Sequence, residues 1–281
     1  MNRAVVVYLD YTRGLLQQFA CLYRSYQYIG ANKDTDLVVF GPKKSLELVP
    51  DDCIKIELEP LEGIWKTYRF MNSIYCVASK EADFLTSYDY ILRTDVDTFL
   101  TPSWNDYIPA YYTVGRGAYA NSDLVRTNLK QISQRFNLRH QGIHNIGSTH
   151  YGNASLVREV CKLSVDIAKY LLEEEFSENE GQWPGWFRGV SSMYSTEIAV
   201  NHLVDMIDIK PEMLDYDSTS INSISLHPHI HCWHTNNLFS KFKYGDGEYD
   251  QLQPNLASNE VRHYCLKMGL DAKRMFPNLF V

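Results

Sequence analysis

The chain has no excess of positive charge. Its 281 residues include 27 lysines and arginines against 34 aspartates and glutamates, which gives a formal net charge of -7 at pH 7. A protein that follows the phosphates of a nucleic acid normally presents a basic face, so the composition argues against a nucleic-acid partner. Any phosphate group that this protein holds should therefore meet a few local cations.

Closely spaced cysteine pairs are also absent. Neither a disulfide framework nor a thiolate zinc site is indicated, because both need paired or clustered cysteines. A reducing compartment fits this pattern best. The six cysteines of the chain are Cys21, Cys53, Cys76, Cys161, Cys232 and Cys265.

The N-terminus lacks a long apolar run. The apolar stretch within residues 3–9 is too short to span a bilayer, and Asp10 interrupts it before the apolar region of a signal peptide could develop. With 45% hydrophobic residues, the chain can still bury a large core. We therefore expect a globular, cytoplasmic protein with neither a signal peptide nor a membrane span.

The first hundred residues alternate between strand and helix patterns. Short β-branched apolar runs predict strands, and apolar residues at helical spacing predict the segments between them. This alternation indicates an α/β fold, in which helices cover both faces of a mainly parallel sheet and ligands collect at the carboxyl ends of its strands. The predicted strands are 3–9, 36–41, 53–58 and 88–97, and the predicted helices are 15–30 and 65–79.

The second half of the chain is less regular, and it shows no repeat or low-complexity linker that would divide the protein. We expect one domain over residues 1–281, in which residues 241–281 wrap the sheet as a tail. The predicted strands are 110–120 and 144–152, and the predicted helices are 123–136, 154–176 and 195–207.

Two carboxylates, Asp95 and Asp97, follow the apolar run of the strand 88–97. In extended backbone they project to the same side, while Val96 turns toward the core. Adjacent anions repel, and a divalent cation is the simplest way to keep both ionised. Oxygen ligands favour Mg²⁺ or Mn²⁺, which complete their shells with water and phosphate oxygens. A turn that uses both aspartates for capping is the alternative.

The stretch "ILRTDVDTFL" resembles the Asp-x-Asp segment of nucleotide-sugar-dependent glycosyltransferases of the GT-A fold. The resemblance implies a Rossmann-type GT-A domain that uses Mn²⁺ or Mg²⁺ and moves a sugar, most commonly from a UDP-sugar, to a hydroxyl of a glycan or glycoprotein acceptor. It assigns the nucleotide to residues 1–100 and the acceptor to residues 101–240. Without a membrane anchor, the chain resembles bacterial enzymes or the soluble glycosyltransferases of large algal viruses.

The same resemblance implies residues that contact the donor. The first strand and the loop after it hold the nucleoside, and basic residues before the Asp-x-Asp touch the diphosphate. A core role for Tyr8, a helix cap at residues 10–12 and exposed-helix roles for Lys66 and Arg69 are the alternatives. The implied donor contacts are Tyr8, Asp10, Tyr11, Arg13, Lys66, Arg69, Arg93, Asp95 and Lys241, with Lys243 as the alternative to Lys241.

A third metal ligand, often histidine, lies near the C-terminus in this family. The segment 227–234 contains four histidines, of which we favour His231, followed by His234 and His229. The metal ligands implied are thus Asp95, Asp97 and His231. A zinc site made by histidines alone is the competing interpretation, weakened by the absence of a suitably spaced fourth ligand.

Transfer also requires activation of the acceptor hydroxyl. Glu197 lies near the start of a predicted helix where inverting members carry a general base, so inversion is slightly favoured. Ser195 as helix N-cap with Glu197 in the first turn is an equally good interpretation. Asp123 and Asp217 are weaker candidates for the base, and a retaining mechanism needs none.

Two other functions share parts of this pattern. A haloacid-dehalogenase-like phosphatase would use Asp95 as a nucleophile, although its Asp-x-Asp normally ends the first strand. A non-catalytic, metal-dependent carbohydrate-binding protein would use the same cation without turnover.

Overall fold

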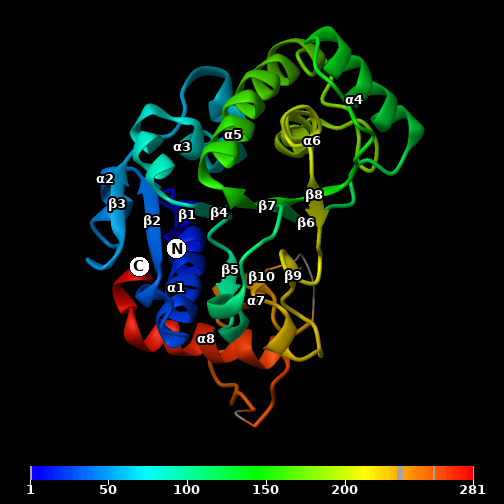
Figure 1. Cartoon of the computed structure of the whole chain (residues 1–281). Coiled ribbons are helices and arrows are strands. Elements are labelled where there is room, and N and C mark those ends of the chain that lie inside the picture. Colours follow the sequence, from blue (N-terminus) through cyan, green and yellow to red (C-terminus); the bar gives the residue numbers. More distant parts are fainter. Residues whose placement is uncertain (1, 233–236, 256, 281) are drawn as a thin grey trace.

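Within residues 2–232, 237–255 and 257–280, which the computed structural model describes, seven strands form the central sheet (Figure 1). Their spatial order is β3-β2-β1-β4-β7-β6-β8, and β7 alone runs antiparallel to its neighbours. The strands are β1 (Arg3–Tyr8), β2 (Thr35–Gly41), β3 (Ile54–Glu57), β4 (Tyr90–Arg93), β6 (Tyr112–Arg116), β7 (Ile146–Asn153) and β8 (Ile207–Ile209).

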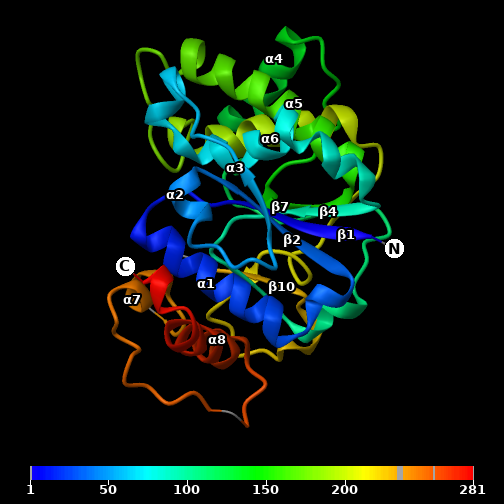
Figure 2. The ribbon, with the colours of Figure 1, turned by 90° about the vertical axis from the view of Figure 1, so that its left-hand side faces the viewer.

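Helices cover both faces of this sheet, as Figures 1 and 2 show. On one face lie α3, α5 and α6, with α4 outside them; on the other lie α1, α8 and a small second sheet. The helices are α1 (Arg13–Tyr28), α2 (Lys43–Leu46), α3 (Asn72–Ala78), α4 (Asp123–Arg135), α5 (Ala154–Tyr170), α6 (Ser191–Leu203), α7 (Lys241–Gly245) and α8 (Val261–Met275). The expected α/β fold with a mainly parallel sheet is thus confirmed.

Alternation along β1 explains why the protein has two apolar cores. Val6 and Tyr8 pack with the helices on the α3 and α5 face, whereas Val5 and Val7 pack with α1 and α8 on the other. Successive side chains of a strand point to opposite faces, so a strand buried on both sides reads as one continuous apolar run.

The small sheet brings the later part of the chain beside the segment after β4. It consists of β5 (Thr98–Leu100), β10 (His229–His231) and β9 (Tyr216–Asp217), with β10 in the middle. His231 is paired with Thr98 on one side and Asp217 on the other. This register fixes His231 next to the Asp-x-Asp segment.

Two predicted helices differ from the observed ones. The segment 65–79 becomes helical only at Asn72, because Gly63 adopts a φ of +68° and the chain then forms short 3-10 turns before α3. The helix predicted at 195–207 runs from Ser191 to Leu203 instead. Its predicted end is extended at Val204 and enters β8, where Ile207 and Ile209 pair with β6 at the sheet edge.

The C-terminal segment packs on the α1 face of the sheet. It contains α7 and the 15-residue α8, which packs along α1. Tyr264, Cys265 and Met268 of α8 are buried in the core on that face. The division into nucleotide, acceptor and tail segments stays a prediction.

All six cysteines are buried and free, as the sequence spacing predicted. Within the described ranges, none of the helices combines the length and the apolar composition that crossing a bilayer requires.

Candidate active site and metal centre

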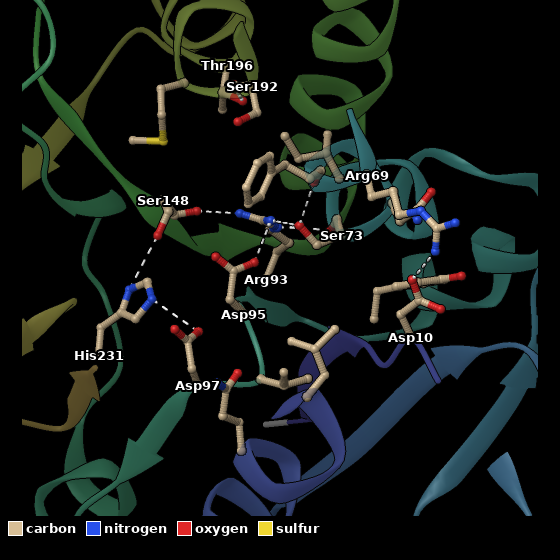
Figure 3. A pocket seen from close by; sticks show the side chains of 18 of the residues that line it. Asp10, Arg69, Ser73, Arg93, Asp95, Asp97, Ser148, Ser192, Thr196 and His231 are labelled. Atoms are coloured by element: carbon tan, nitrogen blue, oxygen red, sulfur yellow. Dashed lines mark hydrogen bonds and ion pairs between the residues drawn. The ribbon is translucent and has the colours of Figure 1, made fainter. Parts of the chain in front are cut away.

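A pocket of about 520 Å³ opens at the carboxyl ends of β1 and β4. In Figure 3, Asp95, Asp97 and His231 lie on one side, Asp10 and Arg69 on the other, and Ser192 and Thr196 of α6 form the wall above them. The volume falls within the range of small-molecule sites in proteins. The pocket lies at the carboxyl ends of strands, where α/β folds bind ligands.

The Asp-x-Asp segment turns sharply after β4. The hydroxyl of Thr98 donates to the backbone oxygen of Asp95 at 2.8 Å, which stabilises the turn. Both aspartates line the pocket, and Val96, which packs in the core on the α1 side, also contributes to the lining. The segment is not a strand, and the predicted separation of the valine from the two carboxylates is only partial.

Arg93 is buried beneath the pocket and positions Asp95. Its Nη2 lies 3.0 Å from Asp95 Oδ1, its Nε donates to the backbone oxygen of Ser73 at 3.0 Å, and its Nη1 donates to the backbone oxygen of Ser148. These bonds connect α3, β4 and β7 around one guanidinium. Most of its donors are therefore occupied before any ligand binds.

Asp97 lies between two cationic side chains. His231 Nε2 is 3.2 Å from its Oδ1, and Lys241 Nζ forms an ion pair with its Oδ2. Burial alone would raise the pKa of Asp97, but the charges of His231 and Lys241 outweigh it and hold the pKa well below its usual range. Asp97 thus stays ionised inside the protein.

Asp215, which the sequence analysis did not single out, completes this arrangement. It is buried, and its Oδ1 lies 3.0 Å from His231 Nδ1. Thr149 donates to Asp215 from both its backbone nitrogen, at 3.1 Å, and its hydroxyl. Burial would raise the pKa of Asp215, but these hydrogen bonds and the His231 charge lower it. No periodic pattern in the sequence points to Asp215, which has a φ of +59° and lies between two short strands.

These residues fit a divalent cation. Asp95, Asp97 and His231 each offer a ligand atom, and the three atoms lie within 4.8 Å of one another. A ligating histidine normally donates its other ring nitrogen to a carboxylate, which fixes the tautomer and the ring orientation. Asp215 is placed to do this for His231. Two carboxylates and one imidazole suit Mn²⁺ or Mg²⁺ with open positions for a ligand.

The remaining predicted donor contacts divide into two groups. Tyr8, Asp10, Arg69, Arg93 and Lys241 line the pocket together with the metal ligands. Asp10 Oδ2 and Arg69 Nη1 form an ion pair at 3.2 Å. The other three contacts, Tyr11, Arg13 and Lys66, do not line this pocket.

Each of these three residues lies elsewhere on the protein, outside the pocket. Tyr11 is 48% exposed. Arg13 lines a second, smaller hollow beside α7. Lys66 is exposed and pairs with Glu62 four residues earlier. Their predicted contacts with the donor have no support in the pocket geometry.

The other histidines of the segment have different partners. His229 is buried, its Nδ1 accepts from the Asp215 backbone nitrogen at 3.2 Å, and burial lowers its pKa to about 4. His227 stacks on Tyr216. His234 lies outside the described residues. Of the described histidines in this segment, His231 alone lies with Asp95 and Asp97, whereas His229 lies beside Asp215.

Glu197 occupies the middle of α6 and has no exposed surface. Its Oε1 lies 2.6 Å from His144 Nδ1, and its Oε2 accepts from the Asn145 backbone nitrogen at 2.8 Å. The pocket is lined by Thr196 instead, one residue away on the helix. The predicted first-turn position after a Ser195 cap is wrong, because the helix begins four residues earlier.

Among solved structures, a crystal structure of an active-site mutant of LgtC is similar to this chain. The similarity covers 76% of this chain and 74% of that chain, with 8% sequence identity and a TM-score of 0.46. A likeness of this size carries no conclusion about function. No curated protein matches the sequence. The family is decided by a match over residues 1–280: the chain belongs to the family described as domain of unknown function DUF7164.

Proposed function

We propose that this protein is a metal-dependent glycosyltransferase that moves a sugar from a nucleotide-diphosphate donor, UDP-linked in the first instance, to a hydroxyl of a glycan acceptor. The observation that carries the proposal is the Asp95, Asp97 and His231 group in a pocket at the strand ends. Such a group holds a hard cation and leaves positions open for phosphate oxygens.

The charges around this group support a diphosphate ligand. Arg69 lies across the pocket, and Lys241 is already paired with Asp97. A bound Mn²⁺ or Mg²⁺ would neutralise negative charge on the departing nucleoside diphosphate. Lys241, released from part of its interaction with Asp97, would then be available to a phosphate oxygen. Arg69 and Lys241 line the pocket, which supports them as the few local cations expected from the acidic composition.

The nucleoside and the acceptor are assigned to different walls of the pocket. Tyr8 ends the first strand, and Asp10, in the loop just after it, offers a carboxylate oxygen that can accept from a ribose or base donor. Ser192, Met193 and Thr196 of α6 also line the pocket, and Figure 3 shows Ser192 and Thr196 above Asp95. A sugar seated between them would lie beside the metal group.

The mechanism at the sugar is left to experiment. Of the described residues that line the pocket, the carboxylates are Asp10, Asp95 and Asp97. Glu197, on which the preference for inversion rested, is buried outside this lining. Its role as general base is therefore not part of the proposal, and inversion is no longer favoured over retention.

Donor hydrolysis gives the most direct test, because it requires no knowledge of the acceptor. The protein is incubated with UDP-sugars and GDP-sugars, with and without Mn²⁺, and release of the nucleoside diphosphate is measured together with binding by calorimetry. We expect Mn²⁺-dependent binding and slow release with one of these donors. Absence of nucleotide binding under all conditions would overturn the proposal.

The same assay separates the alternatives. A phosphatase that used Asp95 as nucleophile would release inorganic phosphate from phosphomonoesters and would not need a sugar nucleotide. A carbohydrate-binding protein would bind glycans with Mn²⁺ but would turn over no donor.

A further inference from the structure

A second cluster of histidine and carboxylate side chains lies away from the pocket lining. His140 and His144 belong to the segment between α4 and β7, and Glu197 belongs to α6. One potential ligand atom from each lies within 4.8 Å of the others. None of the three lines the pocket described above.

Glu197 and His144 are already in contact. Glu197 Oε1 is 2.6 Å from His144 Nδ1, and the Glu197 side chain is fully buried while that of His144 is 12% exposed. The backbone nitrogen of Asn145 donates to the other carboxylate oxygen at 2.8 Å. One Glu197 oxygen is thus held by the backbone, and the other faces the imidazole.

One buried polar atom at this cluster has no hydrogen-bond partner. It is Nε2 of His140. A buried polar atom without a partner costs about 1–3 kcal/mol, and a ligand that binds this nitrogen would remove that cost.

The segment that carries the histidines is held firmly against α6. Asn201, one turn after Glu197, accepts from the backbone nitrogens of Gln141 and Ile143 at 3.0 and 3.1 Å. Its side-chain nitrogen donates to the backbone oxygen of Ile143 at 2.8 Å. The two histidines are therefore presented by a braced loop, and a ligand would find them close to their binding positions.

We propose that His140, His144 and Glu197 form a second metal site, which takes a zinc-class divalent cation. Two imidazoles and one carboxylate are a common donor set for zinc, which leaves a fourth tetrahedral position for water. Nitrogen donors also distinguish this site from the carboxylate-rich group in the pocket, which suits Mn²⁺ or Mg²⁺.

His140 must exchange its tautomer to bind through Nε2. Its Nδ1 accepts from the backbone nitrogen of Gly142 at 3.0 Å, which leaves the proton on Nε2. Ligation moves that proton to Nδ1, so the hydrogen bond from the Gly142 amide is lost when the metal binds.

The experiment uses the full chain with Asp97→Asn, which disables the pocket metal group and leaves the second cluster intact. After dialysis against a chelator, Zn²⁺ alone is titrated in competition with a chromophoric chelator, and Co²⁺ is added separately to record its visible absorption. We expect one equivalent of Zn²⁺ and the strong d-d bands of tetrahedral Co²⁺. Absence of binding overturns the proposal, and it leaves the glycosyltransferase proposal untouched because the pocket is tested separately.

Variants in the same background identify the ligands. His140→Ala should weaken Zn²⁺ binding by more than about 100-fold, beyond the 10–100-fold typical of residues that only support a ligand. Glu197→Gln, which keeps a hydrogen bond to Asn145, should do the same and serves if the first variant fails to fold. His202→Ala is the matched control, since His202 accepts from the Arg139 backbone in the same loop and is outside the cluster. Equal Zn²⁺ affinity in His140→Ala, Glu197→Gln and the control overturns the site.

Discussion

The protein contains two groups that combine carboxylate and imidazole side chains, and they differ in what surrounds them. Asp95, Asp97 and His231 face a pocket of about 520 Å³ with Lys241 at its edge. His140, His144 and Glu197 lie in a closed contact between a loop and α6, outside that lining. The protein therefore has two groups with similar potential metal ligands. One group faces an open pocket, and the other lies within a closed contact.

The comparison shows that access, rather than residue type, separates the proposed roles. An open metal group can exchange its water ligands for the phosphate oxygens of a substrate, whereas a metal in the closed group would hold the loop against α6 and keep a water at its fourth position. The second difference lies in how each histidine is supported. His231 has Asp215 behind it, while His140 has only a local contact with the Gly142 amide.

Among the substitutions considered, we expect the loss of Asp97 from the pocket group to have the largest effect on donor turnover. We expect Asp97→Asn to reduce metal-dependent donor turnover by about 10³-fold, because stabilisation by a bound metal is worth several kcal/mol. Release of nucleoside diphosphate at saturating Mn²⁺ measures it. Asp106→Asn, an exposed position, is the control and should match the wild-type protein. Wild-type turnover in Asp97→Asn would refute the site assignment.

Removal of the carboxylate behind His231 should have a smaller effect. Asp215→Asn is expected to weaken Mn²⁺ binding by about 10–100-fold, since it replaces the carboxylate that orients the ring with a neutral amide. Titration of Mn²⁺ followed by electron paramagnetic resonance measures the affinity, and raised Mn²⁺ should restore turnover. Asp217→Asn, whose carboxylate bonds Thr219, is the matched control. Unchanged affinity in Asp215→Asn would show that His231 needs no such support.

His150 also lines the pocket, but it belongs to neither of the two groups. It therefore serves as a further comparison. Burial, followed by the charge of Arg93, lowers its pKa from 6.5 to about 3. The unfolded chain therefore binds this proton at a higher pH than the folded protein does. The stabilising contribution is present above pH 6.5 and is lost as the pH falls toward 3.

Unfolding by urea at pH 7 and pH 5 checks this contribution. The pH dependence of the wild-type free energy of unfolding should exceed that of His150→Gln by about 2 kcal/mol, as the pKa difference implies. An equally large pH dependence in His150→Gln would show that His150 does not cause it.

The smallest expected effect lies at the rim of the pocket. Arg69→Met should raise the KM for the donor about five- to tenfold, because it removes an exposed cation from the pocket edge and an interaction there is worth about 1 kcal/mol. Lys66→Met is the matched control, since Lys66 is a nearby cation that does not line the pocket. Equal KM values for both variants would remove Arg69 from the donor site.

Several elements could be predicted because their signal is local. A few consecutive residues are enough to identify the apolar runs of β1 and β2, the helical spacing of α1, and the carboxylates after β4. The start of α6 was misplaced by four residues because Ser195 is a plausible cap in the sequence, while the helix in fact begins at Ser191. That shift moved Glu197 from an expected first turn to a buried mid-helix position.

Local patterns in the chain were enough to predict the alternating strands and helices, the two carboxylates at a strand end, and one histidine-rich segment from which a third ligand could come. Only the tertiary structure chose His231 among those histidines and placed Asp215 behind it, because the β5–β10 ladder and a loop between short strands bring them together. It also joined His140 and His144 to Glu197 across more than fifty residues. The periodicity of apolar residues indicates which face of its own helix or strand a residue occupies. Contacts between distant elements depend instead on packing and register.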